Sequence, residues 1–276
     1  MNGQTLPHIK LRPISGWQAL NLAQIWQFRD LLVAFAVRDI KLRYRQTLLG
    51  VAWVVLQPLL AAGIFSFVFG KIAKIDVGQT PYFAFSYIGL LAWNVFNATL
   101  SKTSGCLVQN SGLISKIFFP RLVLPFSTII STLVDFMVAL AMLVALMFYY
   151  KMQPTFAVLT LPFWLVLILM LATGCGLYAS ALMVSYRDVQ YILPVLTQFL
   201  LYGSPVSYPA SAVPMQYRGF YNLNPLVSLV EGFRWAFLGG NLEWRNVVWS
   251  AVLSVIALIC GALAFKKMER QFADVI

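Results

Sequence analysis

Side chains that commonly carry out catalysis are few in this sequence and are dispersed along it. There is one histidine, His8, and the nine acidic residues form no cluster. The phosphate-binding pattern G-x-x-x-x-G-K-[ST] is absent, as are the patterns HExxH and GxSxG. A hydrolase or transferase needs acids, histidines or a metal site gathered in one pocket. The sequence therefore predicts no catalytic centre, and the three scattered cysteines lack metal-ligand spacing.

The polar residues that stand out are those within apolar stretches. Asp135 lies in the middle of a long apolar run, where a charge is costly unless it faces a cavity or a partner. A structural hydrogen bond is the simpler role for it. Glu231 and Arg234 are three residues apart and can pair on one helical face. That pair either stabilises a shallow helix or forms the hinge of an outer gate.

A basic helix is expected just before the first long apolar run. Arg38, Lys41 and Arg45 share one helical stripe, and Arg43 lies between them in sequence. Such a helix suits the headgroup layer of a membrane. Its cations either attract an anionic headgroup or anchor the topology. Its apolar residues form one stripe and a smaller group on the far side: Trp26, Val33, Val37, Ile40 and Tyr44, then Leu31, Phe35 and Leu42.

The composition is that of a membrane protein. The chain is 60% hydrophobic and 11% charged, with a mean hydropathy of +0.78, whereas soluble domains contain about 25% charged residues. Continuous apolar runs, without period-two alternation, favour helical spans. We expect an all-α polytopic membrane protein with six transmembrane helices, at about 49–69, 82–100, 122–150, 156–184, 191–202 and 247–265.

The distribution of Lys and Arg predicts the orientation. Fourteen of the twenty fall on the side that holds both ends of the chain, and six fall on the other. Because cytoplasmic loops carry an excess of positive charge, both termini are expected in the cytoplasm. The net charge of +11 is then explained by topology, and no nucleic-acid partner is expected.

Two segments between the spans have a character of their own. Residues 111–119 are expected to form a two-turn amphipathic helix, which either lies on lipid or inserts into a soluble partner. Residues 205–240 contain too many prolines for a span and are too apolar for a free loop. We expect two short re-entrant helices there that dip into the outer leaflet, with their exposed backbone covered by protein or water.

Four segments resemble a single family in both sequence and order. They are VRDIKLRYRQTLLGVAWVVLQPLL (37–60), GLISKIFFPRLVLP (112–125), YRDVQYILPVLTQFLLYGSPVSYP (186–209) and NPLVSLVEGFRWAFLG (224–239). Together they resemble the ABC-2 type permeases of polysaccharide exporters. The O-antigen (lipopolysaccharide) export permeases are the closest type, and teichoic acid export permeases are similar. The resemblance covers nearly the whole chain after residue 30.

The resemblance implies a transport subunit that is not itself an enzyme. Residues 1–47 would form a cytoplasmic lead and interface helix, and 48–276 the transmembrane domain. Two copies of the chain would pair with two copies of an ABC ATPase, which binds ATP and Mg²⁺, so this chain would need no cofactor. The cargo would be polysaccharide linked to undecaprenyl pyrophosphate, moved across the bacterial inner membrane to the periplasm. Alternatives are teichoic acid or capsule export, and small-molecule efflux by an ABC-2 permease.

The resemblance also assigns roles to particular residues. The interface helix offers candidate headgroup contacts at Arg38, Lys41, Arg43 and Arg45. The ATPase-coupling helix, 111–119, carries Leu113, Ile114, Lys116, Ile117 and Phe118. The periplasmic gate helices, 205–240, and the residues beside them contribute Tyr202, Pro205, Tyr208, Asn224, Pro225, Glu231 and Arg234. The cytoplasmic turn after the fourth span consists of Tyr186, Arg187 and Asp188.

Overall fold

The computed structural model of the protein describes residues 26–45, 50 and 52–269, and in this part of the chain the regular elements are all helices, joined by turns and loops. The expected lead, 1–24, lies outside these residues. The α-helices are α2 Arg29–Tyr44, α3 Ala52–Phe65, α4 Tyr82–Gln109, α5 Ser111–Ile114, α6 Val123–Tyr149, α7 Leu161–Ser185, α8 Val189–Tyr202, α9 Met215–Tyr221, α10 Pro225–Leu238 and α11 Trp244–Met268. A π-helix, η1 Ser66–Ile72, extends α3, and two 3₁₀ segments are η2 Phe156–Thr160 and η3 Ala210–Ala212.

Five helices among the described residues are long and apolar enough to cross a membrane. They are Ala52–Ile72, Tyr82–Gln109, Val123–Tyr149, Phe156–Ser185 and Trp244–Met268. The expectation of an all-α polytopic membrane protein is therefore confirmed, with five of the six expected spans.

The remaining expected span, 191–202, corresponds to α8, which has only 14 residues. A helix of that length rises about 21 Å, which is less than the hydrocarbon core of about 30 Å. It ends at Gly203, two residues before Pro205, where continuation of the helix is disfavoured.

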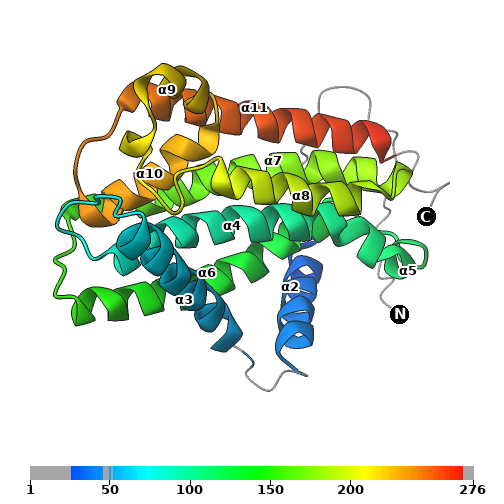
Figure 1. Ribbon diagram of the computed structural model, residues 1–276. Helices are drawn as coiled ribbons and strands as arrows, with labels where there is room; N and C mark the ends of the chain where they lie inside the picture. The colour runs from blue at the N-terminus through cyan, green and yellow to red at the C-terminus, as the bar shows by residue number, and fades with distance from the viewer. Residues whose placement is uncertain (1–25, 46–49, 51, 270–276) are drawn as a thin grey trace, which may run out of the picture.

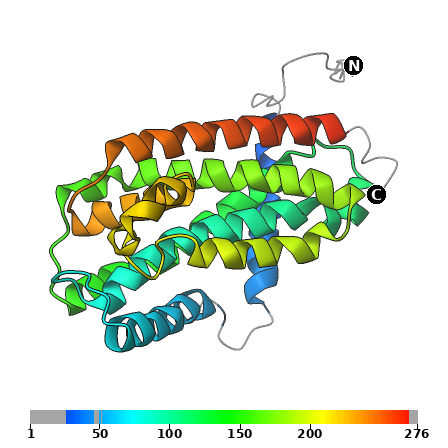
Figure 2. The ribbon, with the colours of Figure 1, turned by 45° about the horizontal axis from the view of Figure 1, so that its top comes forward.

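The long helices run side by side around α4. In Figure 1, α4, α6, α7 and α11 lie along a common direction, and α2 crosses them steeply; Figure 2 shows the same arrangement from another side. The most apolar stretch of α4 has 78% of its residues buried, compared with 11% for α3 with its π-helical extension. Helix α4 is thus the centre of the bundle, and α3 is at its edge.

Glycines allow the central helices to approach each other closely. A Cβ atom on Gly174 of α7 would collide with the backbone of Ala257 on α11, and one on Gly261 would collide with the carbonyl of Gly174. A Cβ on Gly176 would lie 2.7 Å from Cβ of Thr103 on α4. The patch Gly174–Gly176, expected from sequence to permit close helix contact, therefore touches two neighbouring helices.

The segment expected to be a two-turn helix, 111–119, is shorter than predicted. Helix α5 has only four residues, and 115–119 continue as turn and irregular backbone. Two features explain the difference. Pro120 disfavours helical geometry in the residue before it, and the side chain of that residue, Phe119, is buried against Phe35 of α2 with ring centroids 5.5 Å apart.

Candidate functional site

The end of the bundle that holds α9 and α10 is called the outer end here, and the opposite end the inner end, after the orientation expected from the sequence. The outer end is organised around Arg234 of α10, whose side chain is only 3% exposed. Its Nη1 lies 3.0 Å from Oε1 of Glu231. Its Nη2 donates to the carbonyl oxygen of Val206 at 2.6 Å, and Nη1 donates to that of Tyr208 at 3.3 Å. Since Oε1 of Glu231 also accepts from the backbone N–H of Ala210 at 3.0 Å, the ion pair holds the 206–210 loop against α10.

Helix α4 supplies the other wall around this guanidinium. The Cζ atom of Arg234 lies 3.8 Å from the centre of the Phe85 ring, a cation–π contact. Gly89, one turn further along α4, leaves room for the loop: a Cβ there would lie 2.6 Å from Nη2 of Arg234 and collide with the Val206 carbonyl. Tyr82 adds a hydrogen bond from its hydroxyl to the carbonyl of Ser207, at 2.5 Å.

The remaining residues predicted for the outer gate lie in the same cluster. The Tyr208 hydroxyl donates to the carbonyl of Tyr202 at 2.8 Å, and Pro205 is buried in the loop between them. Asn224 caps α10 by accepting from the N–H of Leu226 at 3.0 Å, directly before Pro225 at the first helical position.

The structure thus brings together all seven predicted residues. With Tyr82, Phe85 and Gly89 of α4, which were not assigned to the gate from the sequence, they form what we call the outer cluster. No local pattern in 82–89 indicated this role. The hydroxyl of Tyr82 and the small size of Gly89 matter because both residues contact residues 206–207, which are distant in sequence.

The basic helix α2 packs on the bundle through a face that the sequence stripe did not emphasise. Phe35 and Ala36 are buried, whereas Val33 and Val37 of the main apolar stripe are 52% and 41% exposed. These two residues of the stripe therefore face away from the protein, as suits a helix between protein and lipid.

The predicted headgroup contacts on α2 differ in their surroundings. Arg38 bonds to Asp39 at 2.8 Å and to the Asn110 side-chain oxygen at 2.7 Å, while Lys41 and Arg45 are exposed. The Arg43 side chain is outside the described part of the structure.

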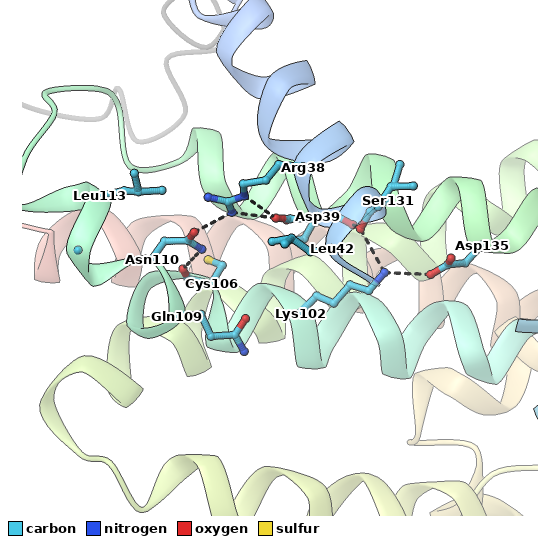
Figure 3. A pocket seen from close by; sticks show the side chains of 13 residues that line it. Arg38, Asp39, Leu42, Lys102, Cys106, Gln109, Asn110, Leu113, Ser131 and Asp135 are labelled. Atoms are coloured by element: carbon cyan, nitrogen blue, oxygen red, sulfur yellow. Dashed lines mark hydrogen bonds and ion pairs between the residues drawn. The ribbon is translucent and has the colours of Figure 1, made fainter. Parts of the chain in front are cut away.

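A cavity of about 500 Å³ separates α2 from α4, α5 and α6. Figure 3 shows polar side chains pointing toward it from α2, α4 and α6. Lys102 of α4 lies 3.0 Å from Asp135 of α6 and donates to the Ser131 hydroxyl at 3.1 Å. Asp135, the acid expected to need a cavity or a partner, therefore has both.

The predicted coupling residues at the inner end divide into two groups. Leu113 and Ile114 are partly covered and pack against the smaller core cluster around Phe35. The others are exposed: Lys116, Ile117 at 55% and Phe118 at 77%.

The turn made by Tyr186, Arg187 and Asp188 is also exposed. It joins α7 to α8 at the same end of the bundle as α5 (Figure 1). In the described ranges, no group of three or more His, Cys, Asp or Glu could hold a metal ion.

Comparison with known proteins gives this arrangement a context. Residues 30–238 match the family model described as ABC-2 type transporter. The chain is 26% identical to an O-antigen export system permease protein RfbA of Klebsiella pneumoniae, over 90% of this chain and 95% of that protein. It is 27% identical to RfbA of Myxococcus xanthus, over 92% and 98%, and 27% identical to the polysialic acid transport protein KpsM of Escherichia coli, over 86% and 92%. The protein therefore belongs to the ABC-2 type transporter family of membrane proteins.

Proposed function

We propose that this chain is the membrane permease of an ATP-driven exporter of polysaccharide, of the O-antigen type. The observation that carries the proposal is the near end-to-end similarity to two proteins named as O-antigen export permeases. The cargo is a polymer linked to undecaprenyl pyrophosphate, and it travels from the cytoplasmic to the periplasmic side of a bacterial inner membrane. Capsule export is the second candidate, because a polysialic acid transport protein is similar over 86% of the chain.

The energy for transport comes from a separate ABC ATPase. The sequence has no P-loop of its own, and the inner end of the bundle presents the apolar side chains of Ile117 and Phe118 to the outside. An exposed apolar knob is suited to insertion into a groove on a soluble partner. Two copies of the permease pair with two copies of the ATPase, because a polymer needs a continuous route with weak, repeated contacts, and one bundle of this size is unsuited to enclosing it.

The basic residues of α2 attract the pyrophosphate headgroup of the cargo. Lys41 and Arg45 are exposed on the helix that crosses the bundle, and each cation near an anionic membrane surface contributes about 1 kcal/mol. Topology anchoring predicts the same charges. Replacing Arg43 and Arg45 by glutamine distinguishes the two roles: normal insertion with slowed export supports headgroup attraction, and normal insertion with normal export contradicts it.

The outer cluster acts as the gate on the periplasmic side. It joins α10 to α4 and to the 203–210 loop through the contacts of Arg234 and Asn224, and it joins α9 to that loop through the hydrogen bond between the hydroxyls of Tyr221 and Tyr208. Helices α9 and α10 have 7 and 14 residues, lengths that suit re-entrant helices in the outer leaflet. With α8 continued by the covered loop after Gly203 as the fifth span, both termini lie in the cytoplasm.

The coupling assignment is tested by the substitutions Ile114→Asp and Phe118→Asp in the full transporter. We expect loss of both polysaccharide export and permease-stimulated ATP turnover, with normal insertion. The control is Phe156→Asp, because Phe156 is even more exposed, at 93%, but begins η2 at the outer end. If export and stimulated turnover are unchanged in both coupling variants, residues 113–118 do not transmit force.

A further inference from the structure

The Lys102–Asp135 pair is unusual because each residue is the only charged side chain of its own long helix. Helix α4 has no other Asp, Glu, Lys or Arg between Tyr82 and Gln109, and α6 has no other between Val123 and Tyr149. The two charges meet at 3.0 Å, with side chains 26% and 12% exposed. Charges inside a membrane helix are costly and usually mark a site that faces a cavity or a partner.

A purely structural explanation accounts poorly for this pair. Buried ion pairs contribute little net stability, and apolar side chains of similar volume often do as well. Helices α4 and α6 are already joined close by through the hydroxyls of Thr103 and Thr128, 3.2 Å apart. The pair is also not sealed in the core, because both of its side chains line the cavity between α2, α4, α5 and α6.

The same cavity contains a second ion pair. Arg38 of α2 bonds to Asp39 and reaches the Asn110 side chain at the end of α4. Figure 3 shows the two pairs approaching the space from different helices. The cavity therefore offers two cations and two carboxylates, and its four formal charges sum to zero.

The net charge of the hollow next to this cavity is positive. A neighbouring hollow on α2 is lined by Ala34, Val37, Arg38, Lys41, Leu42 and Arg45. It shares Arg38 and Leu42 with the cavity and contains three cations and no acid. A ligand that spans both spaces thus meets only positive charge in the hollow and both signs of charge in the cavity.

We propose that the cavity binds the headgroup of an amine-bearing zwitterionic phospholipid, with its phosphate near Arg38 and its ammonium near Asp39 and Asp135. Inside, a simple anion would meet two carboxylates as well as two cations, and a simple cation would first meet the basic hollow. A zwitterion satisfies both signs of charge. The volume of about 500 Å³ is within the range of small-molecule sites, about 300–1,000 Å³, and a helix in the headgroup layer brings the cavity to the depth of its ligand.

An ammonium with three N–H donors suits the carboxylates better than a quaternary amine, because each N–H can donate a charge-assisted hydrogen bond. The site consequently favours phosphatidylethanolamine over phosphatidylcholine, although both headgroups are neutral. It shares the basic surface of α2 with the proposed headgroup contacts of the cargo, but its carboxylates select an amine, which the pyrophosphate of the cargo lacks.

The test uses the full-length chain with its ATPase subunit, stripped of lipid in detergent. The complex is mixed with equal amounts of dioleoyl phosphatidylethanolamine, phosphatidylcholine and phosphatidylglycerol, and retained lipid is measured by native mass spectrometry. We expect at least fivefold more phosphatidylethanolamine than either other lipid. Equal retention, or preference for phosphatidylcholine or phosphatidylglycerol, overturns the proposal. The mixture contains no polysaccharide, so the outcome is independent of the proposed cargo.

Variants locate the site. Asp135→Asn and Asp39→Asn are each expected to reduce the preference at least fivefold, and Lys266→Gln, at the other basic inner helix end, to leave it unchanged. Asp39 is partly exposed, so its variant serves if the Asp135 variant does not fold. A preference that persists in the Asp39 variant contradicts the proposal.

A soluble competitor distinguishes a membrane lipid from a free ester of the same chemistry. A hundredfold excess of phosphoethanolamine that fails to displace the bound lipid supports the lipid as the ligand. Displacement by phosphoethanolamine, with phosphocholine inactive, overturns the lipid assignment and identifies a water-soluble phosphate ester in its place.

Discussion

The two ends of the bundle differ in how far their prominent side chains are buried and bonded within the chain. At the outer end, Arg234 is buried and bonded to three partners, and Asn224 caps its helix. At the inner end, Phe118 and Tyr186 are 77% and 66% exposed. The polar groups of the outer cluster are thus bonded within this chain, although apolar side chains such as Phe156 and Phe220 are exposed at the same end. In the function proposed above, the inner end gains its contacts from the ATPase.

The strongest test of this difference is Arg234→Ala. It leaves Glu231 without its cation and the carbonyls of Val206 and Tyr208 without their donor. We expect a loss of about 3–5 kcal/mol in the free energy of unfolding, as when one partner of a buried pair is removed. Thermal unfolding in detergent, followed by tryptophan fluorescence, measures it. Arg245→Ala, at an exposed outer position, is the control; equal effects of the two variants would show that Arg234 is not the centre of the cluster.

A pair of glycine substitutions compares the ends directly. A Cβ on Gly89 would press on the Val206 carbonyl and on Arg234, whereas one on Gly112 of α5 meets nothing within 4 Å. We expect Gly89→Ala to lose about 1–3 kcal/mol through overpacking, and Gly112→Ala to lose nothing. The same unfolding measurement applies. If both variants unfold like the parent, the contact between α4 and the 206–207 loop is looser than described.

Removing the cap of α10 should have a smaller effect. Asn224→Ala loses the bond to the Leu226 N–H and those to Gly203 and Ser204. The expected loss is about 1–2 kcal/mol, typical of a helix cap. Ser115→Ala at the inner end, where the hydroxyl bond to Gly112 is exposed and 3.4 Å long, should be neutral. A similar loss in both variants would contradict the contrast between the two ends.

The inner end should show the smallest effect on stability and a large one on coupling. Phe118→Asp changes a side chain that is 77% exposed, so unfolding should shift by less than about 0.5 kcal/mol. Stimulated ATP turnover in the assembled transporter should nevertheless fall. A marked loss of stability in the isolated permease would mean that Phe118 already has its partner within this chain.

The sequence predicted the helices well because apolar runs between polar turns determine where spans begin and end. It predicted Glu231 and Arg234 as a pair because three-residue spacing fixes their relation within one helix. It overestimated the helix at 111–119, because periodicity did not reveal that Phe119 is buried against Phe35.

Local sequence patterns could not predict contacts between segments that are distant in sequence. The Lys102–Asp135 pair joins residues 33 positions apart, and Lys102 was read only as one of the basic residues on the cytoplasmic side. The part of Tyr82 and Gly89 in the outer cluster depends on a loop more than a hundred residues away. Such contacts follow from how the helices pack, which one sequence does not specify locally.

The contact between Gly174 and Gly261 provides a built-in chemical reporter. Each glycine has a cysteine as its neighbour, Cys175 on α7 and Cys260 on α11, and both are exposed, whereas Cys106 is buried. Both sites lie within membrane spans, where the thiolate that reacts with maleimide is scarce, so a membrane-permeant maleimide should label these two thiols slowly and spare the third. If α7 and α11 move as one body during transport, the labelling rates of both cysteines stay constant while nucleotide is added and hydrolysed.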